Sequence, residues 1–231
     1  MVNMRPDPSF VYRICHEPRA VFGLFVLSVL TVTALAAPWL APHDPLEQDL
    51  LYSFLPPTWY PQGESGYLLG TDNLGRDIIS RTVYGTRIAL VVAVIAASLA
   101  CLLGTVLGLC AGFFGGKVDL IISRVVDIWM SFPAVLLSIV LVAVIGAGLH
   151  AVIIAIVIID WTRFCRVVRA ETMVQKELDY VASGVTIGLS RIQLLLNEIL
   201  PNLVPLLIVL LSMEMGIAIV VETILSFVGL S

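Results

Sequence analysis

Three acidic residues lie within stretches of the sequence that are otherwise almost entirely apolar. Asp160 interrupts one apolar run, and Glu214 and Glu222 fall within another. A carboxylate inside a membrane is costly unless it faces water, a cation or a partner group, so such residues often line a transport path. We therefore expect Asp160, Glu214 and Glu222 to be candidate pathway residues, and an acidic path would favour cationic cargo. The alternative for Asp160 and Glu214 is structural hydrogen bonding to neighbouring helices, or a protonated acid.

The sequence has no residue pattern typical of an enzyme or of a metal centre. Its histidines, His16, His43 and His150, lie in polar segments or at a turn, without a convincing serine and aspartate set. None of the four cysteines belongs to a Cys-x-x-Cys motif, which argues against a zinc knuckle and a disulfide framework. No Gly-x-x-x-x-Gly-Lys-Ser/Thr motif is present, so the chain is not expected to hydrolyse ATP itself. We predict no catalytic residue, no metal site and no cofactor bound by this chain.

The composition indicates a membrane protein. Hydrophobic residues make up 59% of the 231 residues, charged residues make up 13%, and the mean hydropathy is +1.00. A soluble domain is about half apolar and about one quarter charged. With a net charge of −4 and 13 Lys and Arg residues, the chain lacks the basic stripe that nucleic-acid binding requires. The sequence therefore predicts an all-α polytopic membrane protein in contact with lipid, with no nucleic-acid partner.

Five apolar runs are candidates for helices that cross a bilayer. They cover residues 20–41, 88–116, 128–149, 150–163 with an interruption at Asp160, and about 199–227. Pro133 is expected to kink the third run or to mark its first turn. Ala34-Leu35-Ala36 resembles a signal-peptidase site, but the first run is longer than a cleavable signal, so we predict an uncleaved helix. About five transmembrane helices are therefore expected.

Lys and Arg residues are distributed unevenly between the segments that join these runs. If the N-terminus is cytoplasmic, 10 of the 13 lie inside and 3 lie in the long polar loop at residues 42–87. Cytoplasmic loops carry an excess of Lys and Arg, so this orientation is predicted. Residues 1–19 then form a cytoplasmic tail, 42–87 an external loop, and 88–231 the core, with a cytoplasmic segment at about 163–200.

Small residues recur every four positions in the second run. Gly104, Gly108 and Gly112 have this spacing, and Ala100 and Gly116 extend the series. Spacing of four places residues on one helix face, where the absence of side chains lets a neighbouring backbone approach closely. The pattern predicts a packing face at Gly104, Gly108 and Gly112.

The cytoplasmic segment at 163–200 is unlike a plain connector. Three arginines, Arg163, Arg166 and Arg169, are expected to extend the fourth helix beside the lipid headgroups. Asp179 is a candidate N-cap for a short helix from Tyr180, which Gly184 and Gly188 are expected to end. A short helix between two spans suits docking against a cytoplasmic partner, and a plain interfacial helix is the alternative.

This segment resembles the EAA loop of bacterial ABC-importer permeases. The similar residues are Tyr180-Val181-Ala182-Ser183-Gly184, then Gly188, then Ile199-Leu200-Pro201-Asn202. The resemblance is specific to the branch that imports dipeptides, oligopeptides and nickel. One departure is Ala182, which stands where the family's pattern starts with an acidic residue, so a salt bridge from this position is not expected.

Further motifs of the same branch occur in the expected order along the chain. They are Leu69-Gly70-Thr71-Asp72-Asn73-Leu74-Gly75-Arg76-Asp77 with Ser80-Arg81 and Tyr84-Gly85-Thr86-Arg87, Asp127 with Phe132-Pro133, and Glu222 with Leu225-Ser226-Phe227-Val228-Gly229-Leu230. The resemblance implies a type I ABC-importer permease fold. It also implies a sixth span after the last motif, which this sequence does not contain.

The resemblance implies a half-channel in the bacterial inner membrane, for a peptide or a nickel or metal-chelate substrate. The implied partners are a second permease subunit, two cytoplasmic ATP-binding subunits that hold ATP and Mg²⁺, and an external solute-binding protein. Tyr180, Val181, Ala182, Ser183, Gly184 and Gly188 would couple the chain to the ATPases. The rival hypotheses are a secondary transporter or ion channel that uses Asp160 and Glu214 as a cation or proton path, and a purely structural membrane subunit.

Overall fold

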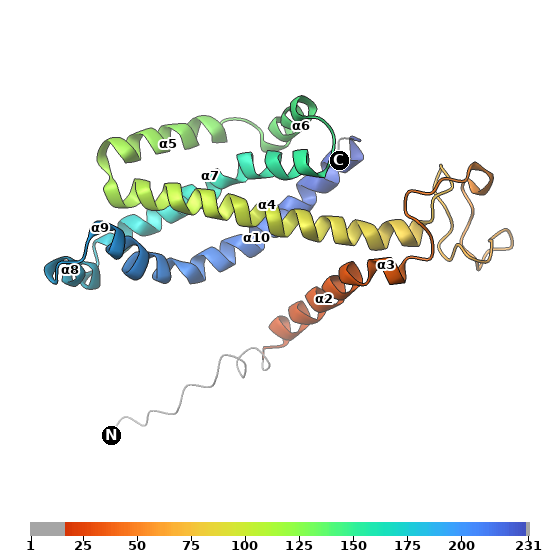
Figure 1. Cartoon of the computed structure of the whole chain (residues 1–231), viewed down its shortest axis with the longest axis horizontal. Coiled ribbons are helices and arrows are strands. Elements are labelled where there is room, and N and C mark those ends of the chain that lie inside the picture. The colour runs from red at the N-terminus through yellow and green to blue at the C-terminus, as the bar shows by residue number, and fades with distance from the viewer. Residues whose placement is uncertain (1–16, 230–231) are drawn as a thin grey trace, which may run out of the picture. The chain divides into compact units, whose positions relative to one another are not determined.

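The computed structural model describes residues 17–229, and within this range it consists of helices and irregular segments without a β-sheet (Figure 1). The all-α prediction is confirmed for these residues. The predicted cytoplasmic tail, together with Cys15, His16 and Leu230, lies largely or wholly outside them. Residues up to Leu90 and residues from Val91 onward form two compact units, which are described separately.

The first unit begins with the helix α2 (Pro18–Leu35), which a single residue separates from the short helix α3 (Ala37–Leu40). Pro18 occupies the first helical position, where its missing N–H group costs no hydrogen bond. Ala34 is the only buried residue of α2, as expected for a helix that lipid surrounds. A 3-10 turn, η1 (Leu50–Tyr52), and an irregular segment lead to α4 (Ile78–Phe114).

The irregular segment after α3 folds around the side chain of Thr71. Its hydroxyl donates to the carbonyl oxygen of Tyr52 and accepts a hydrogen bond of 3.0 Å from the N–H of Leu55. Gly70 has a φ of +79°, a conformation that glycine adopts without strain. A Cβ atom there would lie 3.0 Å from the carbonyl carbon of Pro56. The motif around Gly70 is therefore the centre of a folded loop.

Asp72 holds the other half of this loop together. Its carboxylate accepts from the N–H groups of Leu74 and Arg76 at 2.9 and 3.0 Å, and from the guanidinium groups of Arg76 and Arg81. Burial alone would raise the pKa of Asp72, but these hydrogen bonds and the Arg76 charge outweigh it and hold the pKa below its ordinary value. Through Arg81, Asp72 thus ties the turn at residues 72–76 to the first turn of α4.

The second unit contains the rest of α4 and every later helix of the described range. These are α5 (Gly116–Met130), α6 (Ala134–Ile145), α7 (Leu149–Lys176), α8 (Asp179–Thr186), α9 (Arg191–Gln193), the π-helical turn η2 (Leu194–Ile199) and α10 (Leu200–Phe227). Helix α7 contacts α5, α6, α8 and α10. It is therefore the central helix of this unit (Figure 1).

Three hydrophobic clusters contain residues of α7, and two of them join it to α6, α8 and α10. In one, Ile156 packs with Val142 of α6 and Leu225 of α10. In the other, Val168 packs with Leu194 of η2 and Val181 of α8. The second cluster anchors the short helix α8 to the longer helices of this unit.

Fewer than five of the described helices meet the length and apolarity of a membrane span on their own. Three described helices are long and apolar enough to cross a membrane: α2, α4 and the continuous helix Arg191–Phe227. The pair α5 and α6, which is bent by 89° at residues 131–133, could form a fourth span. Pro133 is the N-cap of α6, so the predicted interruption of the third run at this proline is confirmed. Helix α7 has 28 residues and falls outside this set because charged residues interrupt it.

Candidate functional site

The short helix predicted in the cytoplasmic segment exists as α8, with different ends. Asp179 is its first residue and not its N-cap, because Leu178 already supplies the extended backbone that precedes the helix. The acidic side chain in the first turn is still favourable, since the N-terminal end of a helix carries a partial positive charge. Gly184 lies inside α8 and does not break it. The helix ends at Thr186, and Gly188, two residues later, has a φ of +89°.

The end of α8 is a Schellman motif. The N–H of Leu189 donates to the carbonyl oxygen of Gly184 at 3.1 Å, and the N–H of Gly188 donates to that of Val185 at 3.0 Å. The left-handed backbone at Gly188 turns the chain toward α9, which begins with a capping box between Ser190 and Gln193. Local sequence therefore fixes both the end of α8 and the start of the following helix.

One face of α8 is buried against the chain itself. Val181 and Gly184 are buried, and a Cβ atom at Gly184 would lie 2.7 Å from Cδ2 of Leu194. Tyr180 is half-buried, and its hydroxyl donates to Oε1 of Gln175 at 2.5 Å. Tyr180 and Val181 were expected to anchor a partner, but both residues pack in the chain's own core.

The rest of the surface of α8 is exposed and contains apolar residues that the sequence reasoning missed. It consists of Ala182, Ser183, Val185 and Thr186, and it continues into Ile187. Val185 and Ile187 are large apolar side chains that point away from the protein interior. Helical spacing gave no signal for this exposure, because Val185 follows Val181 by four positions and such residues lie near one helix face.

Three arginines of α7 pair with acids of two other helices. Arg163 donates from Nη1 to Glu214 of α10 at 3.1 Å. Arg166 donates to Asp127 of α5 at 3.0 Å. Arg169 makes two hydrogen bonds with Asp119, also of α5. A carboxylate of the chain thus engages each guanidinium, and the expected position of these arginines beside lipid headgroups stays a prediction.

The three predicted pathway acids are all buried in the second unit, and they do not share one environment. Glu214 accepts from Arg163, so its charge is paired within the chain. Asp160 lies one turn before Arg163 on α7, within electrostatic range of both Arg163 and Glu214. Glu222 lies one turn from Ala218 in the apolar cluster of α10. The structural hydrogen bond that was the alternative for Glu214 is present.

The predicted glycine face of α4 lies against α7. A Cβ atom would lie 2.5 Å from Cβ of Phe164 at Gly104, 2.7 Å from the carbonyl oxygen of Cys165 at Gly108, and 2.7 Å from Cβ of Thr172 at Gly112. Ala100, one turn earlier, is fully buried. Gly116 does not extend this face, because it is the first residue of α5. These small residues allow two helix backbones to approach closely.

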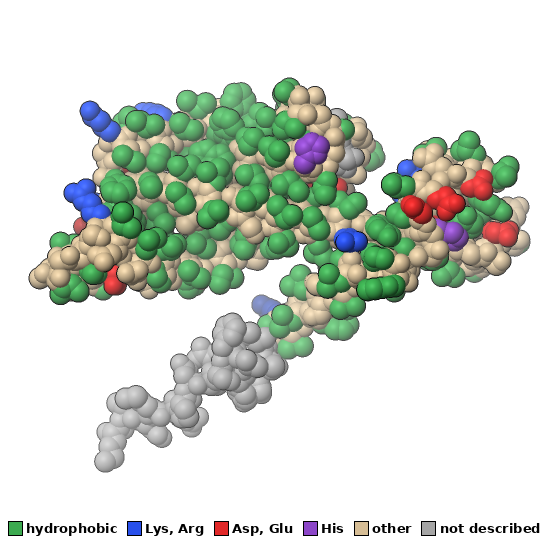
Figure 2. All heavy atoms as spheres, viewed as in Figure 1, with side chains coloured by type: hydrophobic (Ala, Val, Ile, Leu, Met, Phe, Trp, Pro, Cys, Tyr) green, Lys and Arg blue, Asp and Glu red, His purple; other side chains and the backbone are tan. Residues whose placement is uncertain are grey.

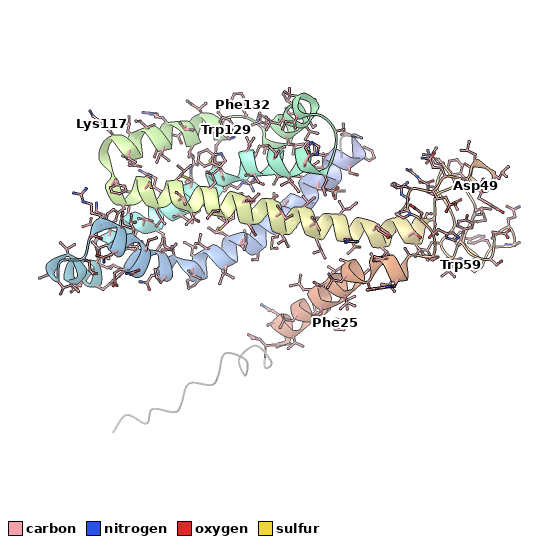
Figure 3. The ribbon with its side chains drawn as sticks, viewed as in Figure 1. Phe25, Asp49, Trp59, Lys117, Trp129 and Phe132 are labelled. Carbon is pink, nitrogen blue, oxygen red and sulfur yellow. The ribbon has the colours of Figure 1, made fainter. Side chains whose placement is uncertain are left out.

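Charged side chains are sparse on the surface of the second unit. The face shown in Figure 2 is mostly hydrophobic, and its Lys and Arg side chains gather toward the end where α8 and the start of α5 lie. Lys117 and Trp129, labelled in Figure 3, mark the two ends of α5. Within residues 17–229, no group of three or more His, Cys, Asp or Glu side chains could hold a metal ion.

The chain is similar to known permease proteins over nearly its whole length. Residues 104–231 match the family described as binding-protein-dependent transport system inner membrane component, and residues 9–57 match the N-terminal TM domain of oligopeptide transport permease C. It is 40% identical over 225 residues to the dipeptide transport system permease protein DppC of Haemophilus influenzae, covering 97% of this chain and 76% of that relative.

Two other permease proteins have a similar identity to this chain and also cover nearly all of it. The di/tripeptide transport system permease protein DppC of Pseudomonas aeruginosa is 35% identical over 233 residues, covering 97% of this chain and 77% of the relative. The glutathione transport system permease protein GsiD of Pectobacterium atrosepticum is 39% identical over 227 residues, covering 97% and 73%.

Proposed function

Because the chain belongs to the family of binding-protein-dependent transport system inner membrane components, we propose that it forms half of the translocation path of an ATP-driven peptide importer. It is a multi-pass membrane protein. The relatives named above are permeases for dipeptides, di- and tripeptides and glutathione. These names favour a peptide over the nickel or metal-chelate substrate that the family branch also allows.

The observation that carries the proposal is that α8 is buried on one side and exposes apolar side chains elsewhere. Its inner face is fixed by Val181, Gly184 and Leu194, while its outer face presents Val185 and Ile187 to solvent. A short helix with an exposed apolar face, held on a buried anchor, is suited to insertion into a groove of a partner. We propose that the partner is a cytoplasmic ATP-binding subunit, which holds ATP and Mg²⁺ and drives alternating access through α8.

The complete assembly would contain a second permease subunit, two ATP-binding subunits and an external solute-binding protein. The N-terminus and α8 would lie on the cytoplasmic side of a bacterial inner membrane, as the Lys and Arg distribution favours. The rival cation path through Asp160 and Glu214 loses support, because Arg163 neutralises Glu214 within the chain. Co-purification of ATP-binding subunits would also separate the importer from a channel and from a purely structural subunit.

A matched pair of valines tests the docking face. Val185 on α8 and Val174 near the end of α7 are 60% and 58% exposed. A buried carboxylate at a docking contact is strongly unfavourable, so Val185→Asp should abolish co-purification of the ATP-binding subunits and ATP-driven peptide uptake. Val174→Asp introduces the same charge at an equal exposure and should retain both. Retention of both properties in Val185→Asp, at normal abundance, would refute docking through α8.

A further inference from the structure

A cavity of about 370 Å³ lies between α5 and α7 in the second unit. Its wall combines apolar atoms with charged groups. The residues that matter for its chemistry are Ile122, Ser123, Val126, Asp127, Arg166 and Arg169. This volume falls in the range of pockets that hold small molecules. Helices α5 and α7 contact each other directly.

The two ion pairs at this cavity differ in how fully they are satisfied. Arg169 and Asp119 make two hydrogen bonds, and their side chains are 30% and 21% exposed. Arg166 and Asp127 make a single hydrogen bond, from Nη2 to Oδ1, and their side chains are 52% and 56% exposed. Within the described residues, Nε and Nη1 of Arg166 and Oδ2 of Asp127 are left without a protein partner.

An open ion pair of this kind fits a zwitterion. The free carboxylate oxygen of Asp127 can accept from an ammonium group, and the free N–H groups of Arg166 can donate to a carboxylate in the paired geometry that guanidinium favours. Binding would replace one protein ion pair by two ion pairs to the ligand, so the net charge of the cavity would not change. A ligand with only one of the two charges would satisfy only one of the two side chains.

We propose that this cavity is a peptide subsite, in which Asp127 binds the terminal ammonium and Arg166 binds the terminal carboxylate of a short peptide. Ile122 and Val126 supply apolar wall for side chains, without hydrogen-bond groups that would select one residue type. This inference rests on the proposed importer function and deepens it, because it assigns recognition of the peptide termini to this chain. The headgroup of phosphatidylethanolamine carries the same ammonium and anionic groups, so the test must separate the two sources.

The first experiment measures protection of the cavity wall. Ser123→Cys, in the assembled transporter in phosphatidylethanolamine-free nanodiscs, is treated with a small thiol reagent, and labelling of residue 123 is quantified by mass spectrometry. Ala-Ala and Ala-Phe should slow labelling. N-acetyl-Ala-Ala and Ala-Ala-amide should protect roughly tenfold less well, because each lacks one charged hydrogen-bond partner. Equal protection by free and blocked peptides, or none by any, would overturn the proposal.

The second arm assigns each terminus. In the Ser123→Cys background, Asp127→Asn should reduce protection by Ala-Ala to the level of the N-acetylated peptide, and Arg166→Gln to the level of the amide. Arg124→Gln, which removes a charge from α5 outside the cavity wall, should leave protection unchanged. Protection that requires phosphatidylethanolamine and not peptide would assign the cavity to lipid and overturn the peptide subsite. ATP-driven Ala-Ala uptake by the parent transporter reports separately on the proposed function.

Discussion

Arg163 of α7 donates from Nη1 to both carboxylate oxygens of Glu214 on α10, at 3.1 and 3.3 Å. The residues are 51 positions apart in the sequence. Glu214 is buried and Arg163 is only partly exposed. The contact therefore links the central helix of the second unit to the last described helix through charges in an apolar setting.

We predict that Glu214→Gln destabilises the protein without changing the charge preference of transport. The variant leaves Arg163 without its anion, and an unpaired group of this kind costs roughly 1–3 kcal/mol. The melting temperature of the purified protein should fall, and Arg163→Gln in the same chain should recover part of the loss. A selective loss of uptake for cationic peptides, with unchanged stability, would instead support the acidic path.

The glycine face of α4 leads to a second prediction. Gly108→Ala should lower the melting temperature, because its Cβ atom would lie 2.7 Å from a backbone oxygen of α7, and overpacking costs about 1–3 kcal/mol. Gly216→Ala on α10 is the matched control, since nothing lies within 4 Å of its added Cβ. It should be neutral or slightly stabilising, as alanine favours helix by about 1 kcal/mol over glycine. Equal effects of the two changes would show that the face is not tightly packed.

The glycine face and the break at Pro133 could be predicted from sequence because each is set by local backbone chemistry. Spacing of four defines a helix face, and a proline disfavours the helical backbone of the residue before it and lacks the N–H group that an interior helix position needs. The ion pairs of Arg163, Arg166 and Arg169 could not be predicted in this way. Their partners lie 39 to 51 residues distant, and helical periodicity does not specify the register between two helices.

The same limit explains the errors at α8. The sequence predicted a short helix and its glycine end, but it could not tell which face would meet α7 and η2. Val181 and Val185 have similar chemistry, and only the tertiary contact with Leu194 buries the first and exposes the second.

A third prediction concerns acid sensitivity of the loop around Asp72. Its pKa is lower in the folded loop than in the unfolded chain. The carboxylate therefore stabilises the loop fully above the unfolded pKa, and the contribution is lost as the pH falls through the folded pKa. Hydrogen-exchange protection factors at residues 71–77 should be lower at about pH 2.5 than at about pH 6. In Asp72→Asn, the protection factors should be low at both pH values. In Glu64→Gln, which changes an exposed residue of the same loop, they should depend on pH as in the parent protein.

The topology gives a fourth prediction. The positive-inside distribution places Glu64 outside and Lys176 inside. A membrane-impermeant thiol reagent applied to intact cells should label Glu64→Cys, and should label Lys176→Cys only after the cells are opened. Labelling of Lys176→Cys in intact cells would invert the predicted orientation.

The last prediction separates the two roles that Gly184 could have. The structure places Gly184 on the buried face of α8, where an added side chain would meet Leu194 of η2 and Leu189. Gly184→Leu should therefore unseat α8 and abolish both co-purification of the ATP-binding subunits and peptide uptake. Leu194→Ala opens space at the same contact, at a cost of about 2–5 kcal/mol by itself. Combined with Gly184→Leu, it should restore part of the uptake, because the new leucine would fill the space that the old one leaves. If Gly184 instead touched the ATP-binding subunit directly, a change at Leu194 could not relieve the clash. The contradicting outcome is a double variant that has normal abundance but no uptake, while Leu194→Ala alone is active. That result would indicate that Gly184 contacts the ATP-binding subunit directly.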